Sequence, residues 1–176
     1  MGRPKGDLVV RGATLATRAA QALRPLCGSV LISIARGTPN PAPGYDTVED
    51  EPPAGRGPLA GIAAAFQVTG KSDLLVLACD YPRIGSHLLD AIVTAAAPDD
   101  DLVMLTDPRG RDHPLVAYWK RTTEPVIRDA LAHREHKVQR LMADLVVRRL
   151  GPRDLVAFDL EWSLKNANSP DDLGSP

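Results

Sequence analysis

The chain has 176 residues and a net charge of −1 at pH 7, and 44% of its residues are hydrophobic but only 4% aromatic. This length suits one α/β domain over 1–176 with an aliphatic core, and the charge balance gives no sign of a nucleic-acid or membrane surface. No apolar run approaches the ~20 residues of a membrane-spanning helix and no signal peptide is recognised, so we expect a cytoplasmic protein.

The predicted elements alternate between strands and helices over the first 106 residues. Short β-branched or apolar runs predict strands, and apolar residues three and four apart predict helices. The strands are expected over 7–11, 29–35, 47–50, 74–79, 102–106, 114–119 and 145–150. The helices are expected over 14–28 (Thr14 as N-cap, Gly28 at the end), 59–70, 86–97, 125–133 and 137–143, and from Ser169. This order predicts an α/β fold with three layers, α/β/α, and a mostly parallel sheet with an antiparallel addition around the turn at 107–113.

The segment from Leu74 to Pro82, L-L-V-L-A-C-D-Y-P, is the centre of this interpretation. Its first six residues are apolar on both faces, which is typical of a strand buried in the middle of a parallel sheet. Asp80 follows directly, and ligands of open α/β sheets gather beyond the carboxyl ends of strands. Asp80 could therefore hold a metal beside a substrate, or it could simply cap a turn.

Other polar groups and glycines fall at strand ends or turns. Gly61 lies inside a predicted helix, where glycine costs about 1 kcal/mol relative to alanine, so we expect a ligand or neighbouring backbone close to it. The remaining candidates are Lys5, Asp50, the G-P-L-A-G turn at 57–61, the D-H-P turn at 112–114, Asn166 and Asn168. Together they could converge at one edge of the sheet, which is the usual place for a nucleotide.

Six short motifs make the chain similar to the MobA-like nucleotidyltransferases, and within them to the molybdenum cofactor guanylyltransferases. They are M-G-R-P-K at 1–5, V-E-D at 48–50, G-P-L-A-G-I at 57–62, C-D-Y-P at 79–82, R-D-H-P-L at 111–115 and N-A-N-S-P-D-D-L at 166–173. The resemblance implies a Rossmann-like nucleotidyltransferase fold. It also implies transfer of GMP from GTP to the phosphate of the molybdopterin cofactor, with release of pyrophosphate.

The resemblance also assigns roles to individual residues. Asp80 would bind Mg²⁺, a hard cation that prefers carboxylate and phosphate oxygens, and Lys5 would supply positive charge to the phosphates. Nucleotide or pterin contacts would come from Ser33, Asp50, Gly57, Pro58, Leu59, Gly61, Asn166 and Asn168. The protein partners it implies are molybdenum-insertion proteins and molybdoenzymes.

Two departures from the family pattern stand out. Ser33 occupies the position of an asparagine with longer reach. The family's opening strand and L-A-G-G loop are also missing before Met1, and only M-G-R-P-K remains. Two neighbouring strands would then lack a partner, and each unmade buried hydrogen bond would cost about 1–3 kcal/mol of folding free energy. We therefore expect Met1 to be an internal methionine of the family's R-M-G motif.

The same residues also allow other interpretations. The chain could be a cytidylyltransferase or another nucleotidyltransferase of this fold, or a non-catalytic chain that binds pterin or a partner. His133 and His136 lie three apart on a predicted helix, but no third ligand is evident, so a solvated helix end is favoured over a metal site. Cys79 has no histidine placed to activate it and is not a persuasive nucleophile.

Overall fold

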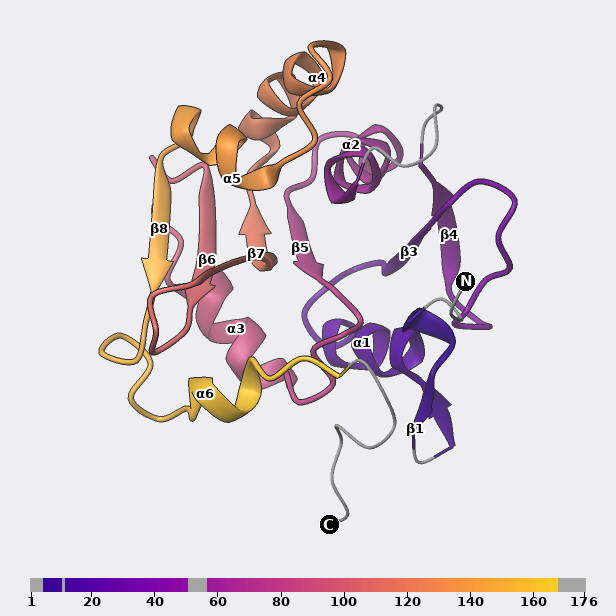
Figure 1. Cartoon of the computed structure of the whole chain (residues 1–176), viewed down its shortest axis with the longest axis horizontal. Helices are drawn as coiled ribbons and strands as arrows, with labels where there is room; N and C mark the ends of the chain where they lie inside the picture. The colour runs from indigo at the N-terminus through magenta and orange to yellow at the C-terminus, as the bar shows by residue number, and fades with distance from the viewer. Residues whose placement is uncertain (1–4, 11, 51–56, 168–176) are drawn as a thin grey trace.

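The computed structural model describes residues 5–10, 12–50 and 57–167, which form sheets between two layers of helices (Figure 1). The strands are β1 (Val9–Val10), β2 (Ala13–Thr14), β3 (Leu31–Ile34), β4 (Asp46–Glu49), β5 (Leu74–Leu77), β6 (Leu102–Thr106), β7 (Asp112–Trp119) and β8 (Val147–Leu150). The helices are α1 (Leu15–Leu23), α2 (Pro58–Thr69), α3 (Ser86–Thr94), α4 (Glu124–Ala132), α5 (Val138–Leu141) and α6 (Leu160–Ser163). Short 3₁₀ helices cover Lys5–Asp7, Arg121–Thr123 and Met142–Asp144.

The main sheet has four strands in the order β5-β7-β6-β8. Strand β7 is antiparallel to both β5 and β6, and β8 is parallel to β6, so three strands share one direction and β7 opposes them. A parallel pair, β3–β4, continues the middle layer beyond β5 (Figure 1). This arrangement confirms the predicted α/β fold and its antiparallel addition.

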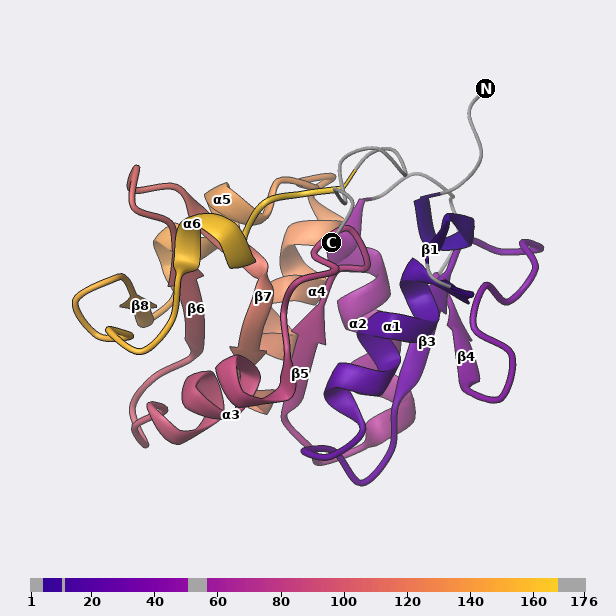
Figure 2. The ribbon, with the colours of Figure 1, turned by 90° about the horizontal axis from the view of Figure 1, so that it is seen from below.

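Each face of the main sheet packs against its own hydrophobic core. One core joins Leu59 and Phe66 of α2 with Ile127 of α4 and with Met104 and Trp119 of the sheet. The other lies on the opposite face and joins α1, α3 and α6 to Val103, Leu105 and Val116. Because alternate residues of a strand point to opposite faces, β6 and β7 supply side chains to both cores. Figure 2 shows the molecule from the side covered by α1 and α3.

The middle layer is split between β3 and β5. Each belongs to a separate sheet, and a cavity of about 1330 Å³ is lined by residues of both. Helices α1 and α2 contact both strands and join the two halves. The prediction that Leu74–Cys79 is a buried strand inside a parallel sheet is therefore wrong: among the described strands β5 pairs with antiparallel β7 alone, at the edge of the main sheet, and all four of its residues are half-buried. The reason is that β3, across the cavity, pairs with β4 in a separate sheet and not with β5.

Most element boundaries agree with the sequence prediction, and β6 matches it completely. Thr14 caps α1 as predicted, accepting a hydrogen bond from the Thr17 N–H at 3.0 Å. The predicted end of this helix at Gly28 is wrong, because α1 ends at Leu23, two residues before Pro25, which has no N–H for the helical ladder. Helix α6 was not predicted, and the helix expected from Ser169 lies outside the described residues.

Among the residues described, no helix is long and apolar enough to span a bilayer.

Asp107 organises the turn between β6 and β7. Its carboxylate accepts hydrogen bonds from the backbone N–H groups of Arg109 and Arg111, both at 2.9 Å, and from Arg111 Nε at 2.7 Å. Its side chain is buried, which by itself raises the pKa, but the backbone and arginine hydrogen bonds outweigh burial and lower it to about 2. The ionised carboxylate therefore stabilises the turn.

Replacing this carboxylate should destabilise the protein in a pH-dependent way. A folded pKa of about 2, below the usual 3.8, means that the stabilisation is present above pH 4 and is lost as pH falls toward 2. We expect Asp107→Asn to lower the free energy of unfolding by about 1–2 kcal/mol at pH 7, and by less at pH 3. Urea unfolding of both proteins measures this difference. Asp99→Asn, at an exposed position, is the control, and a pH-independent loss would contradict the assignment.

Candidate functional site

Asp80 lies just beyond the carboxyl end of β5, as predicted. Strand β5 is aligned by β7, and the Ala78 N–H continues the pairing to the Leu115 carbonyl at 2.8 Å. Cys79 and Asp80 then form a turn that leaves the sheet, closed by a hydrogen bond from the Tyr81 N–H to the Ala78 carbonyl at 3.4 Å. The Asp80 side chain is 20% exposed, so its carboxylate is partly shielded from water.

The structure brings two other predicted residues to this carboxylate. Lys5 Nζ and Asn166 Nδ2 each lie 3.4 Å from Asp80 Oδ2. A backbone hydrogen bond of 2.9 Å from the Ala167 N–H to the Asp80 carbonyl docks the C-terminal segment on this turn. Residues separated by 75 and 86 positions in the sequence thus meet at one side chain. Asn168 lies outside the described residues.

Tyr81 and His113 support the Asp80 turn from the sheet side. The Tyr81 hydroxyl lies 3.0 Å from His113 Nδ1, and Asp107 Oδ2 lies 3.5 Å from His113 Nε2. Burial lowers the pKa of His113, and a neutral ring protonated at Nε2 fits both contacts. Burial, together with the charge of Asp80, raises the pKa of Tyr81, which keeps its hydroxyl as a donor. Sequence reasoning had noted the D-H-P turn but not this link to Asp80.

A second group of predicted residues lies at the carboxyl ends of β3 and β4. The Ser33 hydroxyl donates a hydrogen bond to Asp50 Oδ1 at 2.9 Å. Gly61 packs directly on this pair: a Cβ at position 61 would overlap Ser33 Oγ and lie 3.2 Å from Asp50 Oδ1. The close neighbour expected at Gly61 is therefore a pair of side chains. Helix α2 can approach β3 and β4 this closely only because position 61 has no side chain.

The start of α2 carries the other predicted contacts. Gly57 caps the helix with φ = 69°, a conformation that favours glycine, and Pro58 follows as the first helical residue. Leu59 is completely buried in the hydrophobic core, so its side chain cannot reach a ligand. In the G-P-L-A-G turn, therefore, Gly57 and Pro58 are the residues that a ligand could reach. Gly61 instead allows α2 to pack closely against β3 and β4.

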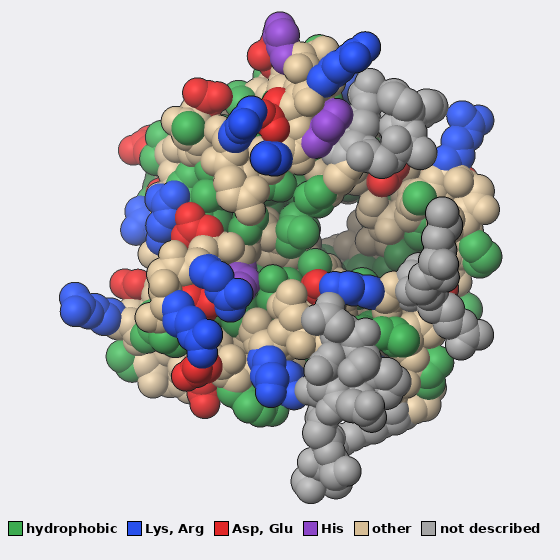
Figure 3. All heavy atoms as spheres, viewed as in Figure 1, with side chains coloured by type: hydrophobic (Ala, Val, Ile, Leu, Met, Phe, Trp, Pro, Cys, Tyr) green, Lys and Arg blue, Asp and Glu red, His purple; other side chains and the backbone are tan. Residues whose placement is uncertain are grey.

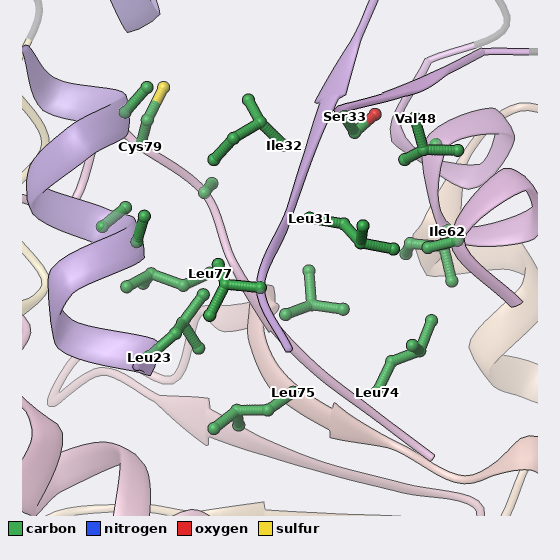
Figure 4. A pocket seen from close by; sticks show the side chains of 18 of the residues that line it. Leu23, Leu31, Ile32, Ser33, Val48, Ile62, Leu74, Leu75, Leu77 and Cys79 are labelled. Atoms are coloured by element: carbon green, nitrogen blue, oxygen red, sulfur yellow. The ribbon is translucent and has the colours of Figure 1, made fainter. Parts of the chain in front are cut away.

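The two groups flank one end of the cavity between β3 and β5. Ser33 and Gly61 line it from one side and Cys79, next to Asp80, from the other. Figure 4 shows Ser33 and Cys79 at the same end of the cavity and Leu74 and Leu75 at the opposite end. Asp50, which is bonded to Ser33, and Asp80, which follows Cys79, thus belong to groups of residues on opposite sides of this end of the cavity.

The Asp80 carboxylate has the chemistry of a Mg²⁺ ligand. Its Oδ1 atom is buried and has no hydrogen-bond partner among the described residues, while Oδ2 faces Lys5 and Asn166. No cluster of three or more His, Cys, Asp or Glu side chains that could hold a metal occurs in the described parts of the chain. A carboxylate with a buried, unbonded oxygen is a suitable ligand for Mg²⁺, because this cation is commonly held by one or two carboxylates together with substrate phosphates and water.

Two minor candidates have simpler explanations. His133 caps the exposed end of α4, with Nδ1 3.4 Å from Asp129 Oδ2, consistent with the solvated helix end that we favoured. His136 does not lie on this helix as predicted: it follows the end of α4, and its Nδ1 is buried without a hydrogen-bond partner among the described residues. Cys27 and Cys79 are free thiols that are half-buried. Burial raises the pKa of both, and the Asp80 charge raises that of Cys79 further, which opposes a nucleophilic role.

The fold and the position of these residues define the class of protein. The structure is similar to molybdopterin-guanine dinucleotide biosynthesis protein A from Archaeoglobus fulgidus, with a TM-score of 0.74 and 22% identity, covering 96% of this chain and 86% of that one. It is also similar to 2-C-methyl-D-erythritol 4-phosphate cytidylyltransferase from Thermus thermophilus, with a TM-score of 0.64, 19% identity and coverage of 88% and 91%. At these identities the likeness establishes the nucleotidyltransferase fold.

The sequence comparisons establish the family. The model of the MobA-like NTP transferase domain matches residues 1–150, and the chain belongs to this family of nucleotidyltransferases. It is 32% identical over 177 residues to a molybdenum cofactor guanylyltransferase of Pseudomonas fluorescens (strain Pf0-1), covering 99% of this chain and 85% of that protein. A protein of the same name from Rhizobium meliloti (strain 1021) is 35% identical over 126 residues, which span 68% of this chain but only 57% of that relative. The family predicted from the six motifs is confirmed.

The close packing at Gly61 can be tested directly. We expect Gly61→Ala to lower the free energy of unfolding by about 1–3 kcal/mol, because the added methyl group displaces Ser33 and Asp50. In a Ser33→Ala background the penalty should be smaller, since the hydroxyl is gone. Urea unfolding of the four proteins measures both effects, with Gly28→Ala, which meets no atom within 4 Å, as control. An unchanged or increased stability of Gly61→Ala would contradict this packing.

Proposed function

We propose that this protein transfers GMP from GTP to the phosphate of the molybdopterin cofactor and releases pyrophosphate. The supporting observation is the carboxylate of Asp80: its buried Oδ1 has no hydrogen-bond partner among the described residues, and its Oδ2 lies 3.4 Å from both a lysine and an asparagine. The names of the relatives support the same reaction and a role in molybdenum cofactor biosynthesis. GTP and the pterin are then the small-molecule substrates.

The chemistry of this transfer suits the residues at the site. Joining one anionic phosphate to another requires alignment and charge neutralisation more than a covalent intermediate. When bound by Asp80, Mg²⁺ would supply positive charge to the α-phosphate and to the departing pyrophosphate. Lys5 would add a second, compact positive charge at the same side chain, because its ammonium already lies beside Asp80. Asn166 would orient the carboxylate or the acceptor through its amide.

The nucleotide would lie across the hollow between the two groups of residues. Asp50, held by the Ser33 hydroxyl, can accept hydrogen bonds from the nucleotide with its remaining carboxylate lone pairs. The backbone around Gly57 and Pro58 offers a close approach without bulky side chains. The choice between GTP and CTP is part of the proposal, and a preference for CTP would favour the cytidylyltransferase alternative.

The central test is removal of the Asp80 charge. We expect Asp80→Asn to reduce Mg²⁺-dependent pyrophosphate release from GTP and molybdopterin at least ~100-fold, because the metal loses its protein ligand. The fold should remain, since within the described part of the chain the Asp80 side chain makes two hydrogen bonds, both long at 3.4 Å. EDTA should abolish turnover by the unaltered protein, and Mg²⁺ should restore it.

Asp90→Asn is the matched control, because Asp90 is exposed on α3, away from the hollow. It should leave turnover unchanged. Full activity of Asp80→Asn would remove this residue from the mechanism. Pterin binding without any pyrophosphate release by the unaltered protein would instead favour the non-catalytic alternative.

A further inference from the structure

A chain of polar side chains connects the turn between β6 and β7 to the Asp80 carboxylate. It begins at Asp107, which three hydrogen bonds from its own turn hold in place. His113 and Tyr81 follow, with Nδ1 of the ring 3.0 Å from the hydroxyl. Asn166 completes the chain, because its side chain hydrogen-bonds to Tyr81 and donates to Asp80 Oδ2. The outer end of the chain lies where basic and acidic side chains gather over the β6–β7 turn and α6 (Figure 3).

The hydrogen bonds of this chain have one consistent direction. His113 Nε2 has no hydrogen-bond partner among the described residues, and the charged oxygen that faces it is Asp107 Oδ2, at 3.5 Å. An ionised carboxylate can only accept, so it favours the ring proton on Nε2 and leaves Nδ1 as an acceptor. The Tyr81 hydroxyl then gives its single proton to Nδ1. Its oxygen can therefore only accept from the Asn166 amide, whose nitrogen also donates to Asp80.

The rigid part of this chain is the end far from Asp80. The side chains of Asp107 and His113 are only 5% and 7% exposed. The rings of His113 and Tyr81 pack edge to face, with their centroids 5.6 Å apart. Asn166, in contrast, is exposed, and its hydrogen bond to Asp80 is long at 3.4 Å. The buried end can therefore fix the exposed amide, which its bond to Asp80 holds only weakly.

We propose that Asp107, His113 and Tyr81 are positioning residues that fix the orientation of the Asn166 amide and, through it, of the Asp80 carboxylate. The inference rests on the proposed function in taking Asp80 as the metal ligand. Because the amide nitrogen donates to two oxygens of the protein, the amide carbonyl remains for a ligand. A flipped amide would bring its carbonyl oxygen against the carboxylate, where two acceptors repel each other.

The first test measures metal binding rather than turnover. In the presence of GTP, we expect Tyr81→Phe to weaken Mn²⁺ binding about tenfold or more, as measured by electron paramagnetic resonance. His113→Leu should do the same, whereas His113→Asn, whose side-chain oxygen can accept at the position of Nδ1, should restore part of the affinity. Tyr118→Phe is the matched control, because it removes a tyrosine hydroxyl that bonds to Asp73 at 2.6 Å, near the other end of β5.

Two further measurements separate positioning from a loss of structure. At pH 7, ¹⁵N NMR should show the proton of the neutral His113 ring on Nε2, and a proton on Nδ1 would overturn the inference. In an Asn166→Ala background, Tyr81→Phe should have no further effect on Mn²⁺ affinity, because Tyr81 acts through that amide. Full additivity of the two losses would overturn it as well.

The outcomes distinguish this inference from the proposed reaction. Unchanged Mn²⁺ binding by Tyr81→Phe, or a loss no larger than that of Tyr118→Phe, would overturn the inference even if GMP transfer is observed. Weakened Mn²⁺ binding by Tyr81→Phe, without any pyrophosphate release by the unaltered protein, would support the inference and contradict the proposed reaction. Absence of Mn²⁺ binding by the unaltered protein would overturn both.

Discussion

Pairing with β7 is the interaction on which the candidate site depends. β7 is the only strand of the main sheet that bonds to β5, with Leu77 opposite Val116, and this register determines where Asp80 leaves the sheet. The beginning of the same strand supplies His113, which holds Tyr81, the residue after Asp80. One strand thus positions the Asp80 turn twice, once through its backbone and once through a side chain.

The other half of the site is held differently. Ser33 and Asp50 belong to the β3–β4 pair, which has no strand partner in common with β5. Their position relative to Asp80 depends on α1 and α2, which pack against both halves. Side-chain packing is less directional than a ladder of hydrogen bonds, so the distance across the hollow is less tightly determined than the distances within each group.

Local signals predicted much of the fold and part of the site. The β-branched runs and the spacing of apolar residues located most elements within a few residues, and Thr14 was recognised as a cap because its hydroxyl suits that position. Asp80 was found because it directly follows an apolar strand, at the end where ligands of open α/β sheets gather. Tyr81 and His113 were missed as a pair because their contact joins residues 32 positions apart, which no local pattern encodes.

The sequence by itself determined the family, the class of fold and several residues of the candidate site, because these depend on residue types, their order and their local periodicity. Only the tertiary structure decided that β5 is an edge strand, that Gly61 makes room for Ser33 and Asp50, and that Leu59 is buried in the core. Those features depend on which strands pair and which surfaces meet. Pairing and packing join residues far apart in the chain, so they follow from three-dimensional contacts rather than from any short stretch of sequence.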